Sequence, residues 1–242
     1  MHDAPPSRFL DRFGWLLVLV LVSIVCQALI DVADSRLAAG VTHAISGAVL
    51  VLAVRVAGVS LRWRRAADVL VLLLLASNLA FGLSQVLPVD AFDAPQGLQP
   101  ELSWLIAAAV APVVVARRLL NHSTVTIQTV LGSVSAYLQI AIAYAFAFQA
   151  IGAVSHLDFF DRAVPTTTYM SVSLQTITTL GSGGLVPATA FGRLVTVSEA
   201  VIGQVFLVTF VALIVTRFAA TPSGAPLGGM DPDASPAKRE QA

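Results

Sequence analysis

The chain has 242 residues, of which 57% are hydrophobic and only 12% are charged. A soluble domain of this size cannot bury that much apolar surface, so the composition indicates a protein that contacts the lipid bilayer. The formal net charge of zero gives no electrostatic reason to expect a nucleic-acid partner, and the single cysteine excludes a framework of disulfides within the chain.

Apolar stretches long enough to cross a bilayer recur along the whole sequence. A spanning helix needs about 20 mostly apolar residues. Six stretches approach or meet this requirement: residues 13–32, 42–60, 67–87, 102–119, 133–153 and 192–218. The sequence therefore predicts an all-α membrane protein with six transmembrane helices.

Basic residues determine the predicted orientation of these helices. The N-terminus, the loop after the second helix, the loop after the fourth helix and the tail all contain Arg or Lys, whereas residues 88–101 contain neither. All strongly basic segments lie on one side if both termini are cytoplasmic, as the positive-inside rule requires. We therefore expect a multi-pass protein of the inner (plasma) membrane of the cell, with both termini in the cytoplasm.

The predicted fourth helix carries too few arginines for a voltage sensor. Such a sensor needs several arginines spaced along one helix, but Arg117 and Arg118 both lie at the cytoplasmic end. We interpret these two residues as interfacial anchors and expect weak or absent voltage gating. Arg55 in the second helix is expected to reach the membrane surface or to form a salt bridge with Asp68 in the third helix.

The segment between the fifth and sixth predicted helices is too long for a tight turn. Residues 166–178 are apolar enough to enter the bilayer as a short helix but too few to cross it. Hydroxyl residues and glycines follow, from Thr178 to Gly184, and the chain leaves through Pro187. Non-helical backbone at membrane depth is tolerated only when it is buried in protein or lines water. Glycine reaches positive φ at little cost, so carbonyl groups here can point toward one axis and replace the water around a permeating cation.

This glycine-rich stretch resembles the T-T-V-G-Y-G-D-x-x-P signature of the tetrameric potassium-channel superfamily, with TTLGSGG at residues 178–184 and Pro187 after it. The similarity covers roughly residues 137–218. It implies a re-entrant pore helix, a selectivity-filter loop and a homotetramer in which each chain supplies one quarter of the ion pathway. It also implies that K⁺ binds to the backbone carbonyls of Thr179, Leu180, Gly181 and Ser182, that Thr179 adds its hydroxyl group, and that Gly183 ends the filter.

The same resemblance assigns roles to residues around the filter. Gln175, Thr178 and Gly184 are expected to support it, and Gly203 matches the position of a hinge glycine in the inner helix. Glu199 is an ionisable group at membrane depth and therefore a functional candidate. We favour a structural role for Glu199, as a bond to the pore helix of its own or a neighbouring subunit. The expected partners are the lipid bilayer, other copies of the chain and monovalent cations, with K⁺ or Na⁺ as the permeant ion and no cofactor.

Departures from the signature leave the ion selectivity open. Ser182 stands at the usual tyrosine position and Gly184 at the usual aspartate position. The pore helix has Ser171 and Val172 where many members have aromatic residues. These changes reduce the bracing behind the filter, and the shape of the filter is one explanation of the discrimination between potassium and sodium. The alternatives are a non-selective monovalent cation channel and a channel-like membrane protein that does not conduct.

Two other function classes fit the sequence less well. The stretch around Ser182 is similar to the G-x-S-G of rhomboid proteases, but position 180 is Leu and the last predicted helix contains no histidine to act as a base. Transporters often contain paired broken helices in two repeats, whereas this chain has one re-entrant segment. We therefore expect neither an enzyme nor alternating-access transport.

Together these features divide the chain into five segments. We expect a cytoplasmic N-terminal segment (1–12), a four-helix sensor-like peripheral domain without an arginine array (13–120), a cytoplasmic linker (121–132), a pore domain (133–218) and a disordered cytoplasmic tail (219–242). The linker has two interpretations, a short helix on the membrane surface or a simple loop. The tail is rich in Gly, Pro, Ser and Ala, which disfavours a folded structure.

Overall fold

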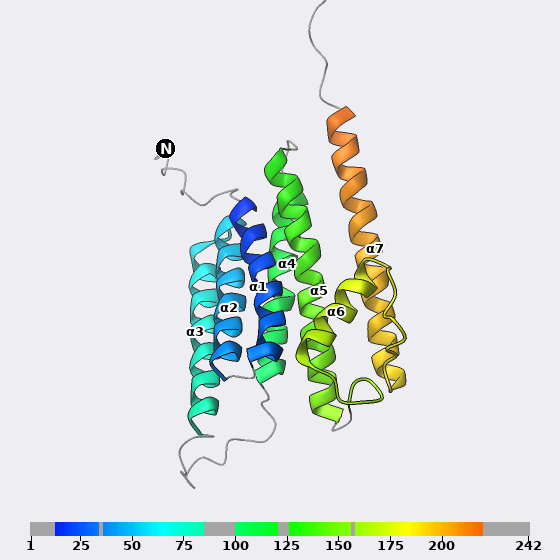
Figure 1. The fold of residues 1–242 in the computed structure, drawn as a ribbon. Helices are drawn as coiled ribbons and strands as arrows, with labels where there is room; N and C mark the ends of the chain where they lie inside the picture. Colours follow the sequence, from blue (N-terminus) through cyan, green and yellow to red (C-terminus); the bar gives the residue numbers. More distant parts are fainter. Residues whose placement is uncertain (1–12, 34–35, 85–99, 121–125, 156–157, 220–242) are drawn as a thin grey trace, which may run out of the picture.

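The computed structural model describes residues 13–33, 36–84, 100–120, 126–155 and 158–219. Within these residues the regular elements are helices (Figure 1): α1 (Phe13–Ala33), α2 (Arg36–Val56), α3 (Leu61–Ser84), α4 (Pro100–Leu120), α5 (Ile127–Ser155), α6 (Thr166–Ile177) and α7 (Ala190–Ala219). The pairing of Phe160 with Pro187 is an isolated bridge. The prediction of an all-α fold is confirmed for this part of the chain.

Helices α1 to α5 pack side by side as a bundle (Figure 1). Both α1 and α4 contact α5, while α2 lies against α1, α3 and α4. The largest fully buried side chains of the bundle come from several helices and include Phe13, Leu16, Leu50, Trp104 and Leu119. In a bilayer such contacts are stabilised by close packing rather than by removal of water, so the fit of these side chains holds the bundle together.

The short helix α6 lies between α5 and α7, to one side of the bundle (Figure 1). Among the described elements, α7 packs only against α5 and α6. Apolar side chains on its remaining surface are exposed, among them Leu194, Val197, Val201, Val205 and Val208. A long apolar helix that is this open requires lipid or another protein surface around it.

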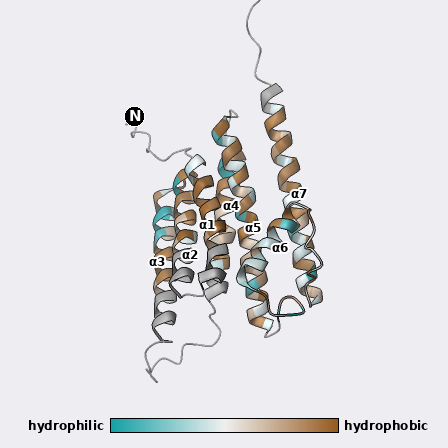
Figure 2. Cartoon of the chain, in the orientation of Figure 1, coloured by the Kyte–Doolittle hydropathy of each residue, from teal (hydrophilic) through white to brown (hydrophobic). Residues whose placement is uncertain are grey.

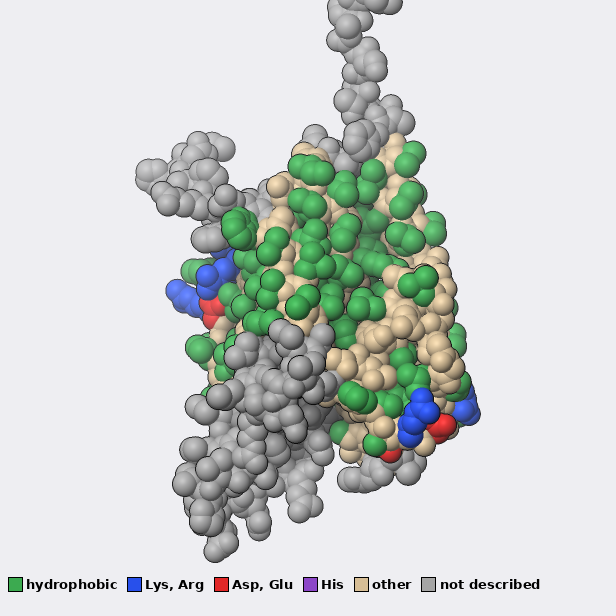
Figure 3. All heavy atoms as spheres, viewed as in Figure 1, with side chains coloured by type: hydrophobic (Ala, Val, Ile, Leu, Met, Phe, Trp, Pro, Cys, Tyr) green, Lys and Arg blue, Asp and Glu red, His purple; other side chains and the backbone are tan. Residues whose placement is uncertain are grey.

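Hydrophobic residues dominate the helices and the face of the molecule that Figure 3 shows. Figure 2 shows mostly brown ribbons, with teal and white more frequent on α3 and around α6. On the face shown in Figure 3, hydrophobic side chains cover the middle, and the coloured charged side chains gather at two edges. This distribution is typical of a protein whose middle zone contacts lipid.

Two described helices are long and apolar enough to cross a membrane, Ile127–Ser155 and Ala190–Thr216. Two shorter stretches, Phe13–Gln27 and Ala44–Val56, are also apolar. These helices and the composition of the chain support an all-α membrane protein. The expected number of six spans goes beyond what the described helices establish.

The start of the third helix differs from the predicted one. Hydropathy places it at residue 67, but α3 begins at Leu61. Arg62, Arg64 and Arg65 therefore lie in its first turns and not in a loop. Arg64 Nε donates a hydrogen bond to the Val59 carbonyl, 2.9 Å away. The reason for the error is that hydropathy marks the apolar part of a helix, whereas the hydrogen-bonded helix also includes polar end residues.

The end of the second helix also differs from the predicted one. α2 ends at Val56 instead of residue 60, and Gly58 follows with a φ of 67°, a left-handed conformation that ends helices. The expected salt bridge is present, with 3.4 Å between Arg55 Nη2 and Asp68 Oδ1. Since the two side chains are 49% and 41% exposed, this pair contributes little to stability.

The predicted linker overlaps the start of α5. Residues 121–125 lie outside the described residues, as do the N-terminal segment 1–12 and the tail from residue 220 onward. From Ile127 the chain belongs to α5, so a boundary between linker and fifth helix at residue 133 is wrong. Thr129 Oγ1 accepts the backbone N–H of Thr126 at 3.2 Å, as in a capping box, which places the helix start here.

Candidate functional site

The last turn of α6 is fixed to α5. The helix ends at Ile177, and Thr178 is its C-cap, with its N–H donated to the Leu174 carbonyl at 3.2 Å. The Tyr137 hydroxyl on α5 donates to the Ile177 carbonyl at 2.6 Å. This bond satisfies one of the carbonyls that a helix leaves without an internal partner at its C-terminus. The hydroxyl of Thr178 bonds the Leu174 carbonyl as well, so its side chain faces the helix.

The glycine-rich loop begins with two bonds back to α6. The N–H groups of Thr179 and Leu180 donate to the carbonyls of Thr176 and Gln175, at 3.0 and 2.8 Å. The side chain of Gln175 bonds Ser171 within α6, with 3.1 Å between Nε2 and Oγ. Gln175 therefore contacts the loop through its backbone carbonyl, while its amide group stays on the helix.

The sign of φ alternates along residues 179–183. Thr179, Gly181 and Gly183 have φ values of 59°, 88° and 61°, whereas Leu180 and Ser182 between them do not have positive φ. No regular helix or strand has positive φ at every second residue, so the loop has an irregular backbone. Glycine adopts the left-handed form at little cost.

Thr179 is the exception, because it is β-branched and still has positive φ. It is the only non-glycine residue with positive φ in the described part of the chain. Such a conformation costs roughly 1–3 kcal/mol and is typical of functional sites. We therefore regard Thr179 as a residue held in place for a function.

The loop is uncovered in the single chain. The Leu180 side chain is 80% exposed. A Cβ atom built on Gly181, Gly183 or Gly184 would meet no atom within 4 Å. These glycines are therefore required by their backbone conformation and not by a lack of space within the chain.

Ser182 and Leu185 close a four-residue turn at the end of the loop. The Leu185 N–H donates to the Ser182 carbonyl at 3.2 Å, and the Ser182 hydroxyl donates to the Leu185 carbonyl at 2.7 Å. Gly183 and Gly184, with φ of 61° and 89°, occupy the two central positions, where a type I′ turn requires positive φ. Ser182 thus braces its own loop.

A polar groove lies between α6 and this turn. Hydroxyl and amide side chains form much of its lining: Thr167, Thr168, Ser171, Gln175 and Ser182. Small polar side chains therefore line the space between α6 and the loop.

Glu199 connects α7 to the buried face of α6. Its side chain is 0% exposed, and its Oε1 atom is hydrogen-bonded to the Ser173 hydroxyl. The same hydroxyl also bonds the Ala141 carbonyl on α5, at 2.7 Å. The expected contact between Glu199 and the short helix of its own chain is therefore present, and it joins three helices.

Gly203 is the place where α7 comes closest to the end of α6. A Cβ atom on this residue would overlap the Ile177 side chain and lie 3.2 Å from the Ile177 carbonyl oxygen. α7 continues as a helix through this position. The absence of a side chain at Gly203 thus serves packing against the residue that precedes the loop.

The chain segments on either side of α6 and its loop are tied to each other. The Ala188 N–H donates to the Phe159 carbonyl at 2.9 Å, next to the bridge between Phe160 and Pro187. Arg193 Nη1 donates to the Pro187 carbonyl at 3.2 Å. The Phe159 ring stacks on Phe148 of α5 and meets Phe160 edge-on. These ring contacts hold the entry and exit segments of the loop against α5.

The sequence does not indicate the contact of Tyr137 with Ile177 or that of Phe159 with the exit of the loop, and for Glu199 it indicates the short helix but not Ser173 as the partner. Each partner lies on a different element, so a local pattern does not indicate which residue it meets. The lone ionisable residue Glu199 gave the one usable signal, because a buried carboxyl group needs a polar partner.

The ligand atoms that the loop can present are uncharged oxygens. The hydrogen-bond acceptors of the loop are backbone carbonyls and the Thr179 hydroxyl. The C-terminus of α6, which carries a partial negative charge, lies next to the loop. In the described part of the chain, no group of three or more His, Cys, Asp or Glu side chains is arranged to hold a metal ion.

Comparison with known proteins gives a family match over this region. Residues 134–220 match the model of the family described as "Ion channel". The matched stretch begins in α5, includes α6 and the glycine-rich loop, and ends just after α7. No curated protein and no solved structure matches the chain.

Proposed function

We propose that the chain forms a membrane channel that passes K⁺ down its electrochemical gradient, because residues 134–220 match the model of the ion channel family. The conduction site is the loop at residues 179–183. The ligands are the carbonyls of Thr179, Leu180, Gly181 and Ser182, with the Thr179 hydroxyl in addition and Gly183 at the outer mouth. The irregular, glycine-rich backbone of this loop carries the proposal, because carbonyls outside a helix or strand can turn toward an ion and replace its hydration shell.

The electrostatics of the loop favour a cation over an anion. Its ligands are oxygen atoms, and the C-terminal end of α6 adds partial negative charge nearby. The conduction site contains no basic side chain that would attract an anion. An ion channel, rather than an enzyme, is also what the family match implies.

Several hydrogen bonds support a loop stiff enough to select K⁺. The backbone bonds of Thr179 and Leu180 to α6 hold its start, and the turn between Ser182 and Leu185 holds its end. Three residues support the loop in this proposal. The carbonyl of Gln175 accepts the Leu180 N–H, Thr178 caps the C-terminus of α6, and Gly184 adopts the positive φ that the turn requires.

A non-selective cation channel is the second candidate, and one observation favours it. The Ser182 carbonyl already accepts the Leu185 N–H at 3.2 Å. An oxygen that is engaged in this turn is less available to an ion, so one of the four proposed carbonyl ligands is weakened. A site with fewer strong ligands would discriminate less between K⁺ and Na⁺.

The open loop and the exposed surface of α7 favour a homotetramer. Loops of this kind form an ion site only as a ring, and the uncovered glycines leave room for neighbouring copies. In the proposed channel α5, α6 and α7 form the pore domain, and α1 to α4 cross the membrane as a peripheral domain, which gives six spans. Both termini are proposed to face the cytoplasm at the inner (plasma) membrane, because most of the basic residues then lie on that side, with Arg36, Arg162 and Arg193 as the exceptions.

Voltage is not the proposed gating stimulus. Arg117 and Arg118 are the basic residues of α4, and both lie in its last turn. A helix without an arginine array moves little charge across the membrane field. Gly203 remains the proposed point about which α7 moves.

Ion flux from liposomes tests the proposal directly. Purified protein is reconstituted in liposomes loaded with KCl, and K⁺ release is measured for the wild type and for Gly181→Ala. Position 181 has a φ of 88°, which costs a non-glycine residue roughly 1–2 kcal/mol, so we expect the variant to lose the flux. Gly14→Ala is the matched control, because its Cβ would make an ordinary contact, 3.6 Å from Leu131 Cδ1. Equal flux for wild type and Gly181→Ala would exclude the loop as the conduction site.

A further inference from the structure

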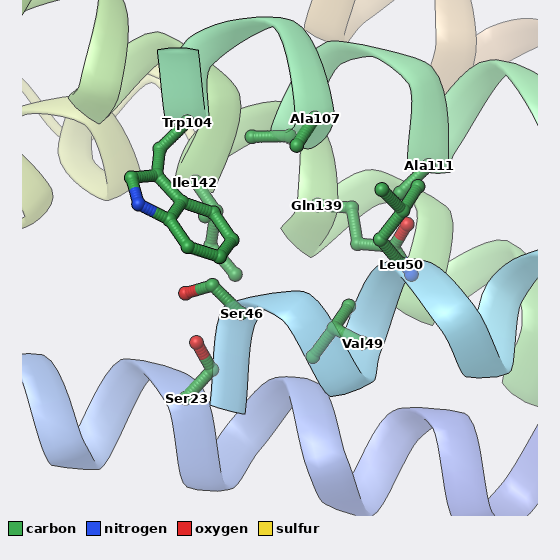
Figure 4. A pocket seen from close by; sticks show the side chains of 10 residues that line it. Ser23, Ser46, Val49, Leu50, Trp104, Ala107, Ala111, Gln139 and Ile142 are labelled. Atoms are coloured by element: carbon green, nitrogen blue, oxygen red, sulfur yellow. The ribbon is translucent and has the colours of Figure 1, made fainter. Parts of the chain in front are cut away.

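A small cavity lies inside the bundle, away from the loop. Residues of α1, α2, α4 and α5 line it, and Figure 4 shows Ser23 and Ser46 with their hydroxyl groups turned toward each other. Gln139 of α5 lies farther along the cavity, beside Leu50 and Ala111. About 20 Å³ of the cavity is open to the centre of a water molecule.

Polar atoms around this cavity have no partner within the described part of the chain. They are the hydroxyl oxygens of Ser23 and Ser46 and both amide atoms of Gln139. Ser23 and Gln139 are only 1% and 2% exposed. A buried polar group without a hydrogen bond costs about 1–3 kcal/mol in proteins, and native structures contain few of them. Four such atoms around one hollow indicate that something occupies it.

The lining determines what kind of molecule fits. Two hydroxyl groups and one amide offer both donors and acceptors, and the lining contains no charged side chain. A lone ion would lack a counter-charge here, so a neutral molecule with donors and acceptors is required. A cavity needs roughly 10–15 Å³ of such volume to hold one water molecule, and this cavity offers only slightly more.

We propose that this cavity is an internal water-binding site that joins α1 and α2 to α5. Water held here accepts and donates hydrogen bonds to Ser23, Ser46 and Gln139 in place of the partners that the chain does not supply. Gln139 lies in the segment that matches the ion channel family, whereas Ser23 and Ser46 lie outside it. The bound water therefore links the peripheral helices to the channel segment, and it does so whether or not the loop conducts K⁺.

Filling the cavity in two backgrounds tests the proposal. Ala107 is a buried lining residue of α4, and Ala107→Val adds two methyl groups there. In the wild type this substitution should lower the Tm in detergent, because it displaces water and leaves polar groups without partners. In the background Ser23→Ala/Ser46→Ala/Gln139→Leu the same substitution should be neutral or raise the Tm, because it then fills an apolar hollow.

Two results of this experiment would overturn the proposal. A higher Tm for Ala107→Val in the wild type would mean that the cavity is dry. An equal loss of Tm in both backgrounds would mean that the added methyl groups are simply too large and that the polar groups do not depend on the hollow.

A direct measurement covers the case in which the triple variant does not fold. Magnetisation transfer from water to the Gln139 side-chain amide is recorded by NMR on the detergent-solubilised full chain, and the resonance is assigned by its loss in Gln139→Met. We expect a cross-peak that persists when a water-soluble paramagnetic reagent suppresses contacts with bulk solvent. Absence of the cross-peak in the wild type would overturn the proposal.

Discussion

Ser173 on α6 and Glu199 on α7 are hydrogen-bonded to each other in a space that is closed to solvent. The Ser173 hydroxyl also meets the Ala141 carbonyl at 2.7 Å, so one side chain joins α5, α6 and α7. Glu199 Oε2 has no hydrogen-bond partner in the described part of the chain. The Ser173 hydroxyl is therefore the polar contact that holds the Glu199 carboxyl group.

Removing this hydroxyl should be costly. Ser173→Ala leaves the carboxyl group of Glu199 buried without a partner, and we expect a loss of about 1–3 kcal/mol in the free energy of unfolding. The measurement is the Tm of the purified protein in detergent. Ser171→Ala is the control, because its side chain is exposed on the same helix and surface changes usually stay within about 0.5 kcal/mol.

The double variant Ser173→Ala/Glu199→Leu separates a specific bond from general packing. With both polar groups replaced by apolar ones, no buried group is left unsatisfied, and the Tm should recover much of the loss. If the two substitutions lower the Tm additively, the bond does not hold the helices in the way we describe.

The closeness of Gly203 and Ile177 predicts a second effect. Gly203→Ala places a methyl group into the Ile177 side chain, so α7 must move away from the end of α6. Overpacking of this kind costs typically about 1–3 kcal/mol. We expect a lower Tm and a reduced K⁺ flux from liposomes. A residue that acts only as a hinge would leave the Tm unchanged, and that outcome would refute a packing role.

The hydroxyl of Tyr137 should hold the start of the loop in place. Tyr137→Phe removes the donor that meets the Ile177 carbonyl at 2.6 Å and keeps the ring against Phe206. We expect a loss of about 0.5–1.5 kcal/mol in stability and a reduced flux. Tyr144→Phe removes a bond to Ser198 instead, away from the loop, and should leave the flux closer to that of the wild type. Equal flux for both variants would contradict this role of Tyr137.

The Ser182 hydroxyl offers a test of selectivity that leaves the backbone ligands intact. Ser182→Ala keeps the carbonyl but removes the bond to the Leu185 carbonyl at 2.7 Å. If this bond stiffens the outer end of the loop, the ratio of K⁺ to Na⁺ permeability should fall while current remains. An unchanged ratio in bi-ionic recordings would show that the hydroxyl has no part in selection.

Features with a local cause were accessible from the sequence. The short helix was expected at residues 166–178 and is found at Thr166–Ile177, because an apolar run between polar segments marks its length. The salt bridge from Arg55 to Asp68 follows from their positions on adjacent helices. The bond of Glu199 to α6 follows from the need of a buried carboxyl group for a partner.

Features that depend on contacts between distant elements were not accessible. The approach of Gly203 to Ile177 and the bond from Tyr137 require the mutual placement of α5, α6 and α7. The cavity at Ser23 and Gln139 arises where four helices meet, and each residue alone looks like an ordinary polar interruption of an apolar helix. The start of α3 was missed because its first turns are basic and hydropathy does not register them.

The central claim is that cations pass through the loop at residues 179–183 with a preference for K⁺. The most direct measurement is the reversal potential of the purified protein in a planar bilayer, with potassium chloride on one side and sodium chloride on the other. The account predicts current that reverses near the potassium equilibrium potential. A reversal near zero would contradict the preference for K⁺, and the absence of current at every voltage would contradict the proposed conduction itself.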